Sequence, residues 1–305
     1  MYVPRRPARS EFVPVRNLRY HVLTWGEPAD ARPPLVLLHG WMDVGASWQF
    51  VVDAMREERF IVAPDWRGYG LTEGGGVDNY WLPDYLADLD WLLDHYAGDR
   101  AVDLVGHSMG GNVAMHYAGV RPKRLRRVVN LEGFGMPAYR ADEAPARYGR
   151  WIDELKRLHA GGMDLASYPA AEGVARRLMK TNPRLTQDKA DWLARQWASC
   201  TKDGEGAERW NILGDPAHKV INANLFRVDE ALALYAAIEA PVLAVEASDD
   251  SLRGWWGKRY SLEEYHERLK SVRDVRIAQV DDAAHMLHHD QPERVAGLIE
   301  DFLAG

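Results

Sequence analysis

Cysteine is the scarcest residue in this chain of 305 amino acids, with Cys200 as its one copy. A single cysteine excludes an intrachain disulfide and a structural zinc site built from several thiolates. Long apolar runs are also missing. The LVLL run at 35–38 is far shorter than the roughly 20 residues of a membrane-spanning helix. No apolar signal-peptide core is visible among the first twenty residues. We therefore expect a cytoplasmic protein without a membrane partner.

An excess of basic residues is the next absence, because the formal net charge is −7. Nucleic-acid binding normally needs a basic face, so we expect no nucleic-acid partner. Hydrophobic residues make up 47% and charged residues 27%, which is typical of a globular protein. Arg5, Arg6 and Arg9 lie among prolines, which predicts a solvated and partly disordered tail. Tryptophan, in contrast, is abundant, with 12 copies.

Short apolar runs alternate with helical patterns along much of the chain. Such runs, bounded by glycine or proline, are typical of strands buried on both faces. Strands that alternate with helices predict parallel strand–helix–strand units. The fold class is therefore α/β, with a mostly parallel central sheet flanked by helices. The predicted buried strands are 35–38, 59–63, 101–105, 127–131 and 241–245.

The alternation of strand and helix patterns stops between residues 135 and 238. This part shows helical patterns, such as 148–159, 186–199 and 228–238, and no convincing buried strand. The strand–helix alternation resumes after it. We therefore predict one catalytic domain, formed by residues 1–134 plus 239–305, with a helical cap at 135–238 inserted between two of its strands.

A Gly-x-Ser-x-Gly pattern at 106–110 stands directly between a predicted buried strand and a predicted helix. A turn this sharp strains the backbone of its central residue, Ser108. The flanking Gly106 and Gly110 let neighbouring backbones approach without a Cβ clash. The pattern therefore predicts a nucleophile elbow that lifts the Ser108 hydroxyl above the sheet edge.

Four motifs occur in an order that resembles the α/β-hydrolase family. They are His39-Gly40, the Asp65-x-Arg67-Gly-x-Gly loop, GHSMGG at 106–111, and His285 near the end of the chain. The resemblance covers nearly the whole chain and points to the serine-nucleophile branch with a helical cap domain. The insertion matches the place where that branch carries its cap. We expect the Asp65 and Arg67 side chains to be structural and to bind each other or nearby backbone.

The resemblance also implies roles for individual residues. Ser108 would be the nucleophile and His285 the general base. The backbone amides of Trp41 and Met109 would form the oxyanion hole, which stabilises negative charge on the former carbonyl oxygen. His288 and His289 are alternative bases, or else belong to a helix-entry turn or the pocket wall.

The acidic partner of His285 has more than one candidate. The common family position, after the strand that follows the insertion, falls on Asp250, and Asp249 is one residue away. A second family position, after the strand that follows the nucleophile helix, falls on Glu132. We expect Asp250 first, with Glu132 as the alternative acid.

A serine nucleophile with a histidine base suits acyl transfer to water. We therefore expect a carboxylesterase-like serine hydrolase that cleaves an ester or related acyl bond of a small to medium, mostly apolar substrate. A carbon–carbon bond hydrolase or perhydrolase on the same site is an alternative, and a ligand-binding protein with little turnover is another. Dehalogenases and epoxide hydrolases of this family use an aspartate at the elbow. We expect no cofactor and no metal, and the sequence leaves the oligomeric state open.

The predicted cap holds four of the tryptophans. Each of them either packs the cap onto the core or lines the substrate pocket. They are Trp151, Trp192, Trp197 and Trp210.

Overall fold

The computed structural model describes residues 2–29, 32–202, 204 and 206–305. Their main feature is an eight-stranded sheet with the strand order β1-β2-β4-β3-β5-β6-β10-β11. Neighbouring strands from β4 to β11 are parallel, whereas β1 and β2 join antiparallel at one edge. The predicted α/β class with a mostly parallel sheet is therefore confirmed. The strands are β1 (Arg9–Val15), β2 (Leu18–Trp25), β3 (Leu35–Leu38), β4 (Ile61–Pro64), β5 (Val102–His107), β6 (Leu125–Leu131), β10 (Val242–Ala247) and β11 (Val275–Val280).

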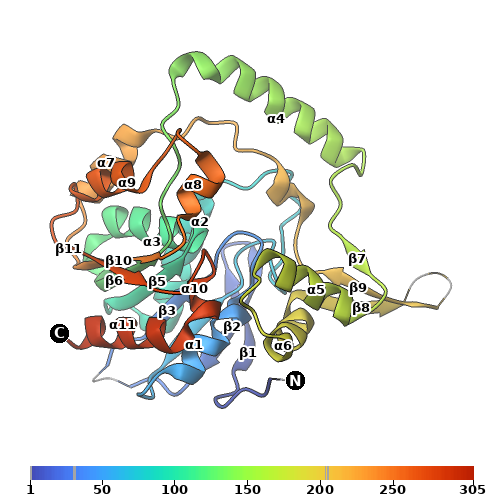
Figure 1. The fold of residues 1–305 in the computed structure, drawn as a ribbon, viewed down its shortest axis with the longest axis horizontal. Helices are drawn as coiled ribbons and strands as arrows, with labels where there is room; N and C mark the ends of the chain where they lie inside the picture. Colours follow the sequence, from blue (N-terminus) through green and yellow to red (C-terminus); the bar gives the residue numbers. More distant parts are fainter. Residues whose placement is uncertain (1, 30–31, 203, 205) are drawn as a thin grey trace.

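Helices cover both faces of this sheet (Figure 1). One apolar core joins the sheet to α2, α3 and α9, and a second core joins it to α1 and α11. The central strands are buried along their whole length, which explains why they appear in the sequence as continuous apolar runs. The helices are α1 (Gln49–Ala54), α2 (Leu82–Ala97), α3 (Met109–Val120), α8 (Ser251–Trp256), α9 (Leu262–Leu269), α10 (Leu287–Asp290) and α11 (Pro292–Ala304), with 3-10 turns at Gly45–Trp48 and Pro122–Arg124.

The chain leaves the sheet after β6 and returns to it at β10. Between them it forms helices and also a three-stranded antiparallel sheet, β7-β9-β8, which the sequence did not predict. These strands are short and mostly exposed, so they produce no buried apolar run. In Figure 1, α4 arches over the top of the molecule, apart from the sheet. The elements are α4 (Ala144–His159), β7 (Ser167–Tyr168), α5 (Ala171–Thr181), α6 (Gln187–Trp197), β8 (Ala198–Lys202), β9 (Glu208–Ile212) and α7 (Val228–Ala236), with 3-10 turns at Ala141–Glu143 and Pro216–Lys219.

The N-terminal segment is more ordered than the sequence predicted. The backbone amides of Arg5 and Arg6 each donate to the Asp53 carboxylate, at 2.8 Å. Arg9 begins edge strand β1 and pairs with Glu27. The arginine–proline composition hid this order, because the contacts are made by backbone groups to a side chain more than forty residues away.

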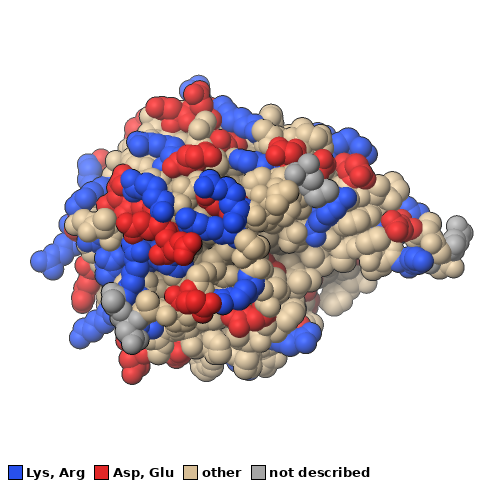
Figure 2. Space-filling model, turned by 90° about the horizontal axis from the view of Figure 1, so that it is seen from below, with Lys and Arg blue, Asp and Glu red and all other residues tan. Residues whose placement is uncertain are grey.

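Two further sequence expectations, no basic face for a nucleic acid and no membrane-spanning helix, concern the surface. Figure 2 shows acidic and basic side chains intermixed over the face it presents, without a large area of one sign. Among the described residues, no helix combines the length and apolar character that crossing a membrane requires.

Candidate active site

Ser108 lies at the turn between β5 and α3, as the elbow pattern predicted. Its backbone has φ 54° and ψ −114°, a left-handed conformation that a residue with a side chain seldom adopts. A Cβ on Gly106 would lie 2.3 Å from the Gly110 carbonyl oxygen, and one on Gly110 would lie 2.4 Å from the Leu38 carbonyl oxygen. Only glycine therefore fits at the two flanking positions, and their close packing holds Ser108 in its strained turn.

Ser108, His285 and Glu132 are joined by two hydrogen bonds. The Ser108 hydroxyl lies 2.9 Å from Nε2 of His285, and Nδ1 of His285 lies 3.2 Å from Oε2 of Glu132. The second Glu132 oxygen accepts a hydrogen bond from the Ala247 amide at 2.8 Å. Hydroxyl, imidazole and carboxylate are thus aligned in the order that general-base activation of a serine requires.

The structure brings Glu132, and not Asp250, to His285. Asp250 caps helix α8 instead, where its side chain accepts a hydrogen bond from the Arg253 amide at 2.9 Å. Asp249 is exposed and pairs with Arg184 at 2.9 Å. Both aspartates belong to a surface turn, whereas Glu132 is buried beside β10, with its amide bonded to the Val245 carbonyl. Of the predicted acids, Glu132 is therefore the one that contacts His285.

Burial shifts the pKa values of Glu132 and His285. It raises the pKa of Glu132 to about 7 and lowers the pKa of His285 below its usual value. A neutral imidazole is the form that accepts the Ser108 proton.

The loop of His285 is fixed by contacts on both sides. The Asp290 carboxylate accepts a hydrogen bond from the Ala284 amide at 2.9 Å. The His285 carbonyl is 2.7 Å from Nε2 of His107, the residue before Ser108. Among the sequence candidates for the base, His285 is the one that contacts Ser108. His288 and His289 are buried on α10.

Trp41 and Met109, the two predicted oxyanion residues, flank the elbow. Met109 is the first residue of α3. A Cβ on Gly40 would come within 3.2 Å of the Ser108 Cβ, so the loop that continues to Trp41 packs directly on the nucleophile turn. His39 fixes this loop, because its Nε2 accepts from the Trp66 amide at 2.8 Å. This placement agrees with a supporting role for His39.

The two charged side chains of the DxRGxG loop make structural contacts, and those of Asp65 to backbone are among the contacts predicted. Asp65 accepts backbone hydrogen bonds from Gly45 and Leu71, at 2.7 and 2.9 Å. Arg67 binds Asp88 of α2 through two nitrogens, at 2.6 and 2.8 Å. Asp65 and Arg67 therefore tie separate segments together, and no direct bond between these two described side chains is present.

A cavity of about 440 Å³ opens onto Ser108 and His285. Most of its wall is apolar or aromatic, and Arg177 and Lys219 add two cationic side chains. Among the four tryptophans of the insertion, Trp197 lines this cavity. Its other lining residues are Trp41, Met42, Asp43, His107, Leu178, Thr181, Asn182, Leu185, Leu193, Trp255, Met286 and His289.

Sequence reasoning missed Trp255. Its ring meets the His285 ring edge-on, with centroids 4.3 Å apart. Trp255 belongs to α8, a helix too short to produce a periodic sequence signal. Trp255 lies five residues after Asp250, and this closeness to a predicted site residue was the one sequence signal for it.

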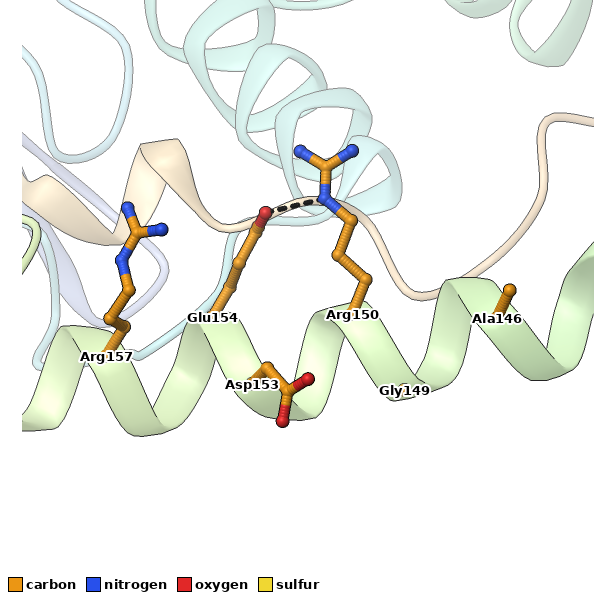
Figure 3. A pocket seen from close by; sticks show the side chains of 6 residues that line it. All are labelled: Ala146, Gly149, Arg150, Asp153, Glu154 and Arg157. Carbon is orange, nitrogen blue, oxygen red and sulfur yellow. Dashed lines mark hydrogen bonds and ion pairs between the residues drawn. The ribbon is translucent and has the colours of Figure 1, made fainter.

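Two other hollows differ from this cavity. One of about 430 Å³ is lined by Met109, Asn112 and residues of α7. The other lies along α4, and Figure 3 shows that its labelled residues all come from that one helix, with Arg150 bonded to Glu154. Neither hollow is lined by Ser108 or His285.

Comparison with known proteins agrees with this architecture. The sequence model of the alpha/beta hydrolase fold matches residues 33–292. The chain belongs to the α/β-hydrolase family. It is similar to a serine hydrolase-like protein of Danio rerio, at 28% identity over 98% of this chain and 89% of that protein. It is also similar to the AB hydrolase superfamily protein YfhM of Bacillus subtilis, at 25% identity over 97% of this chain and 98% of that protein.

Among solved structures, the thioesterase domain from the curacin biosynthetic pathway superimposes with a TM-score of 0.79. It is 22% identical, and the match covers 96% of this chain and 99% of that one, which supports the shared fold. The family match and the named relatives identify this α/β-hydrolase as an enzyme that hydrolyses a small-molecule substrate.

Proposed function

We propose that this α/β-hydrolase is a serine hydrolase that cleaves an ester or related acyl bond of a small to medium, mostly apolar substrate. The observation that carries the proposal is the chain of two hydrogen bonds from Ser108 through His285 to Glu132. A serine at the elbow is unsuited to the alkyl-enzyme chemistry of the aspartate branch. The apolar wall of the adjoining cavity supports the substrate class.

In the proposed reaction, His285 Nε2 takes the proton of Ser108 as the serine oxygen attacks the substrate carbonyl carbon. Glu132 keeps the imidazole oriented and stabilises the imidazolium that forms. The backbone amides of Trp41 and Met109 would stabilise the oxyanion. The imidazolium then protonates the leaving group, and an acyl-enzyme remains. Water, deprotonated by His285, attacks the acyl-enzyme and releases the acid and free Ser108.

We further propose that residues 135–238 act as a lid on a core of residues 1–134 plus 239–305. The lid supplies Leu178, Leu193 and Trp197 to the wall around Ser108. A lid made of apolar groups would exclude bulk water from the acyl-enzyme and select substrates by shape.

The proposal is tested by covalent labelling with a fluorophosphonate probe, which reacts with activated serines. We expect one label per chain, which Ser108→Ala abolishes together with hydrolysis of p-nitrophenyl esters. Ser167→Ala, at an exposed position in β7, is the control and should label normally. Labelling that survives in Ser108→Ala would contradict the proposal.

A further inference from the structure

Three buried side chains converge behind the Ser108 cavity. Asp43 follows β3, two residues after Trp41, and His288 and His289 belong to α10. One ligand atom from each residue lies within 4.8 Å of the other two. Their exposed fractions are 3%, 0% and 3%. Such a group of one carboxylate and two imidazoles needs a physical explanation, because polar groups this deeply buried are normally satisfied.

Four polar atoms of these three side chains have no hydrogen-bond partner among the described residues. They are Oδ2 of Asp43, Nε2 of His289 and both ring nitrogens of His288. The Asp43 Oδ2 and the His288 Nε2 are 3.9 Å apart, too far for a hydrogen bond. The side chains therefore point toward a common place without binding one another.

The remaining polar atoms of Asp43 and His289 are anchored. Oδ1 of Asp43 accepts hydrogen bonds from the Ser47 hydroxyl and, at 3.2 Å, from Nε1 of Trp197. The His289 ring is hydrogen-bonded to the backbone of Ser47. Metal-binding histidines and carboxylates usually have such outer contacts, which fix the ring tautomer and aim the free atom at the ion.

The hydrogen-bonding capacity of the group favours a cation over a shared proton. With its other nitrogen protonated toward the backbone, Nε2 of a neutral His289 is an acceptor, and an ionised Asp43 is an acceptor at both oxygens. Each of the two imidazoles and the carboxylate can offer one lone pair, and a cation can accept all three at once.

We propose that Asp43, His288 and His289 bind a divalent transition-metal ion, with Zn²⁺ as the best match. Imidazole nitrogens and a carboxylate oxygen are the ligands that Zn²⁺ commonly takes, and three protein ligands leave one position open. Asp43 and His289 line the Ser108 cavity, so the ion has a route in and the open position can hold water. The cation would also pair the buried Asp43 carboxylate.

An ion at this place would connect the two loops that carry the proposed chemistry. Asp43 follows the Trp41 loop, and His288 is three residues after His285. The His107 ring lies between, with centroids 4.2 Å from His288 and 4.7 Å from His285. We therefore expect metal loading to change the turnover of the proposed hydrolase, whereas the binding itself does not depend on that function.

The test is metal binding by the full chain after treatment with a chelator. Calorimetric titration with Zn²⁺ is expected to give one ion per chain. Titration with Co²⁺ is expected to give the visible absorption of a low-coordinate site. Asp43→Asn and His289→Gln should each weaken Zn²⁺ binding at least about 10–100-fold, the range found even for outer contacts. His159→Gln, at an exposed histidine, is the control and should bind like the unchanged chain.

Circular dichroism of each variant checks that it is folded. X-ray absorption of the Zn²⁺-loaded unchanged chain provides a test that needs no variant, and two imidazole ligands are expected. Failure of the unchanged chain to bind Zn²⁺ or Co²⁺, or equal binding by folded Asp43→Asn and His289→Gln, would overturn the proposal. The serine-hydrolase proposal is judged separately, because it depends on labelling of Ser108.

Discussion

The carboxylate beside His285 is buried, and its position depends on an unusual backbone conformation. Glu132 has φ 55°, a left-handed value that turns its side chain toward the sheet edge at the end of β6. The Ala247 amide then holds one of its oxygens. A residue that accepts this conformational strain while being buried next to a histidine is typical of a functional site.

Replacing Glu132 with Gln removes the charge that stabilises the imidazolium and keeps the side chain's size. We expect kcat/KM for p-nitrophenyl esters to fall by roughly 10²–10⁴-fold. Asp250→Asn is the matched control, because Asn caps a helix about as well as Asp. It should leave both activity and thermal stability nearly unchanged. A large loss in Asp250→Asn with little loss in Glu132→Gln would restore Asp250 as the acid.

The pH dependence of the reaction follows from the same pair. The reactive form has an ionised Glu132 and a neutral His285, and burial raises the pKa of Glu132 to about 7. Protonation of the pair below that pH removes the reactive form. We therefore expect kcat/KM to be constant above about pH 7 and to fall roughly tenfold per pH unit below it.

Rate measurements between pH 5 and 9 test this expectation. In Glu132→Gln the residual activity should lose its dependence near pH 7, because burial lowers the pKa of the remaining imidazole. A flat profile between pH 5.5 and 8 in the unchanged chain would contradict the assignment.

Sequence spacing alone could not choose between Glu132 and Asp250. The two residues follow β6 and β10, which are neighbouring parallel strands, so both come to the same edge of the sheet. Local structure separates them: Glu132 turns inward, while Asp250 begins a helix at the surface. For the base, the strand–loop context favoured His285 over His288 and His289, and His285 is the one that is hydrogen-bonded to Ser108.

At the scale of elements, helix α3, which follows Ser108, packs closely against α7, the last helix of the insertion. A Cβ on Gly119 would lie 2.3 Å from the Leu234 carbonyl oxygen. Glycine usually weakens a helix by about 1 kcal/mol relative to alanine. Here it permits the contact between two backbones.

Gly119→Ala is therefore expected to lower the free energy of unfolding by roughly 1–3 kcal/mol, the usual cost of overpacking. Gly297→Ala in α11 is the matched control, because its added Cβ meets nothing within 4 Å. That change should raise the free energy of unfolding by about 0.5–1 kcal/mol. Urea unfolding curves measure both effects, and a stabilised Gly119→Ala would contradict the close packing of α3 on α7.

Buried strands were predictable from the sequence and exposed ones were not. Central strands such as β3 and β5 are covered on both faces, so burial fixed their apolar composition. The strands of the small sheet β7-β9-β8 are largely exposed or half-buried, so their sequences show no alternation of apolar and polar residues that would predict them. The α/β class was accordingly confirmed, while the composition of the insertion was predicted only in part.

At the scale of the whole molecule, the insertion has its own small apolar core. Val174, Leu178 and Leu193 of α5 and α6 pack with Phe50 of α1. Pairing across such distances in sequence could not be read from local patterns. The core makes the cavity wall around Ser108 depend on how the insertion sits against the sheet.

Tyr2, in the N-terminal segment, contacts both α1 of the core and α6 of the insertion. The Tyr2 ring contacts Phe50 and Trp192 edge-on, with centroids 5.0 and 5.5 Å away. Its amide donates to the Asp188 carbonyl of α6 at 3.1 Å, and its hydroxyl bonds to Asp53 of α1. One residue thus contacts both the helix beneath the sheet and a helix that lines the cavity.

Tyr2→Ala should therefore loosen α6 and raise KM for p-nitrophenyl esters several-fold, with a smaller effect on kcat, because Ser108 and His285 are untouched. Each aromatic pair contributes about 0.5–1.5 kcal/mol beyond its buried area, so the melting temperature should also fall. Limited proteolysis should become faster within 165–215. Tyr2→Phe keeps the ring contacts and should therefore leave KM close to that of the unchanged chain. Arg9→Ala removes an exposed ion pair and should also change little. If Tyr2→Ala leaves KM and the cleavage rate unchanged, the N-terminal segment does not control how the insertion closes the cavity.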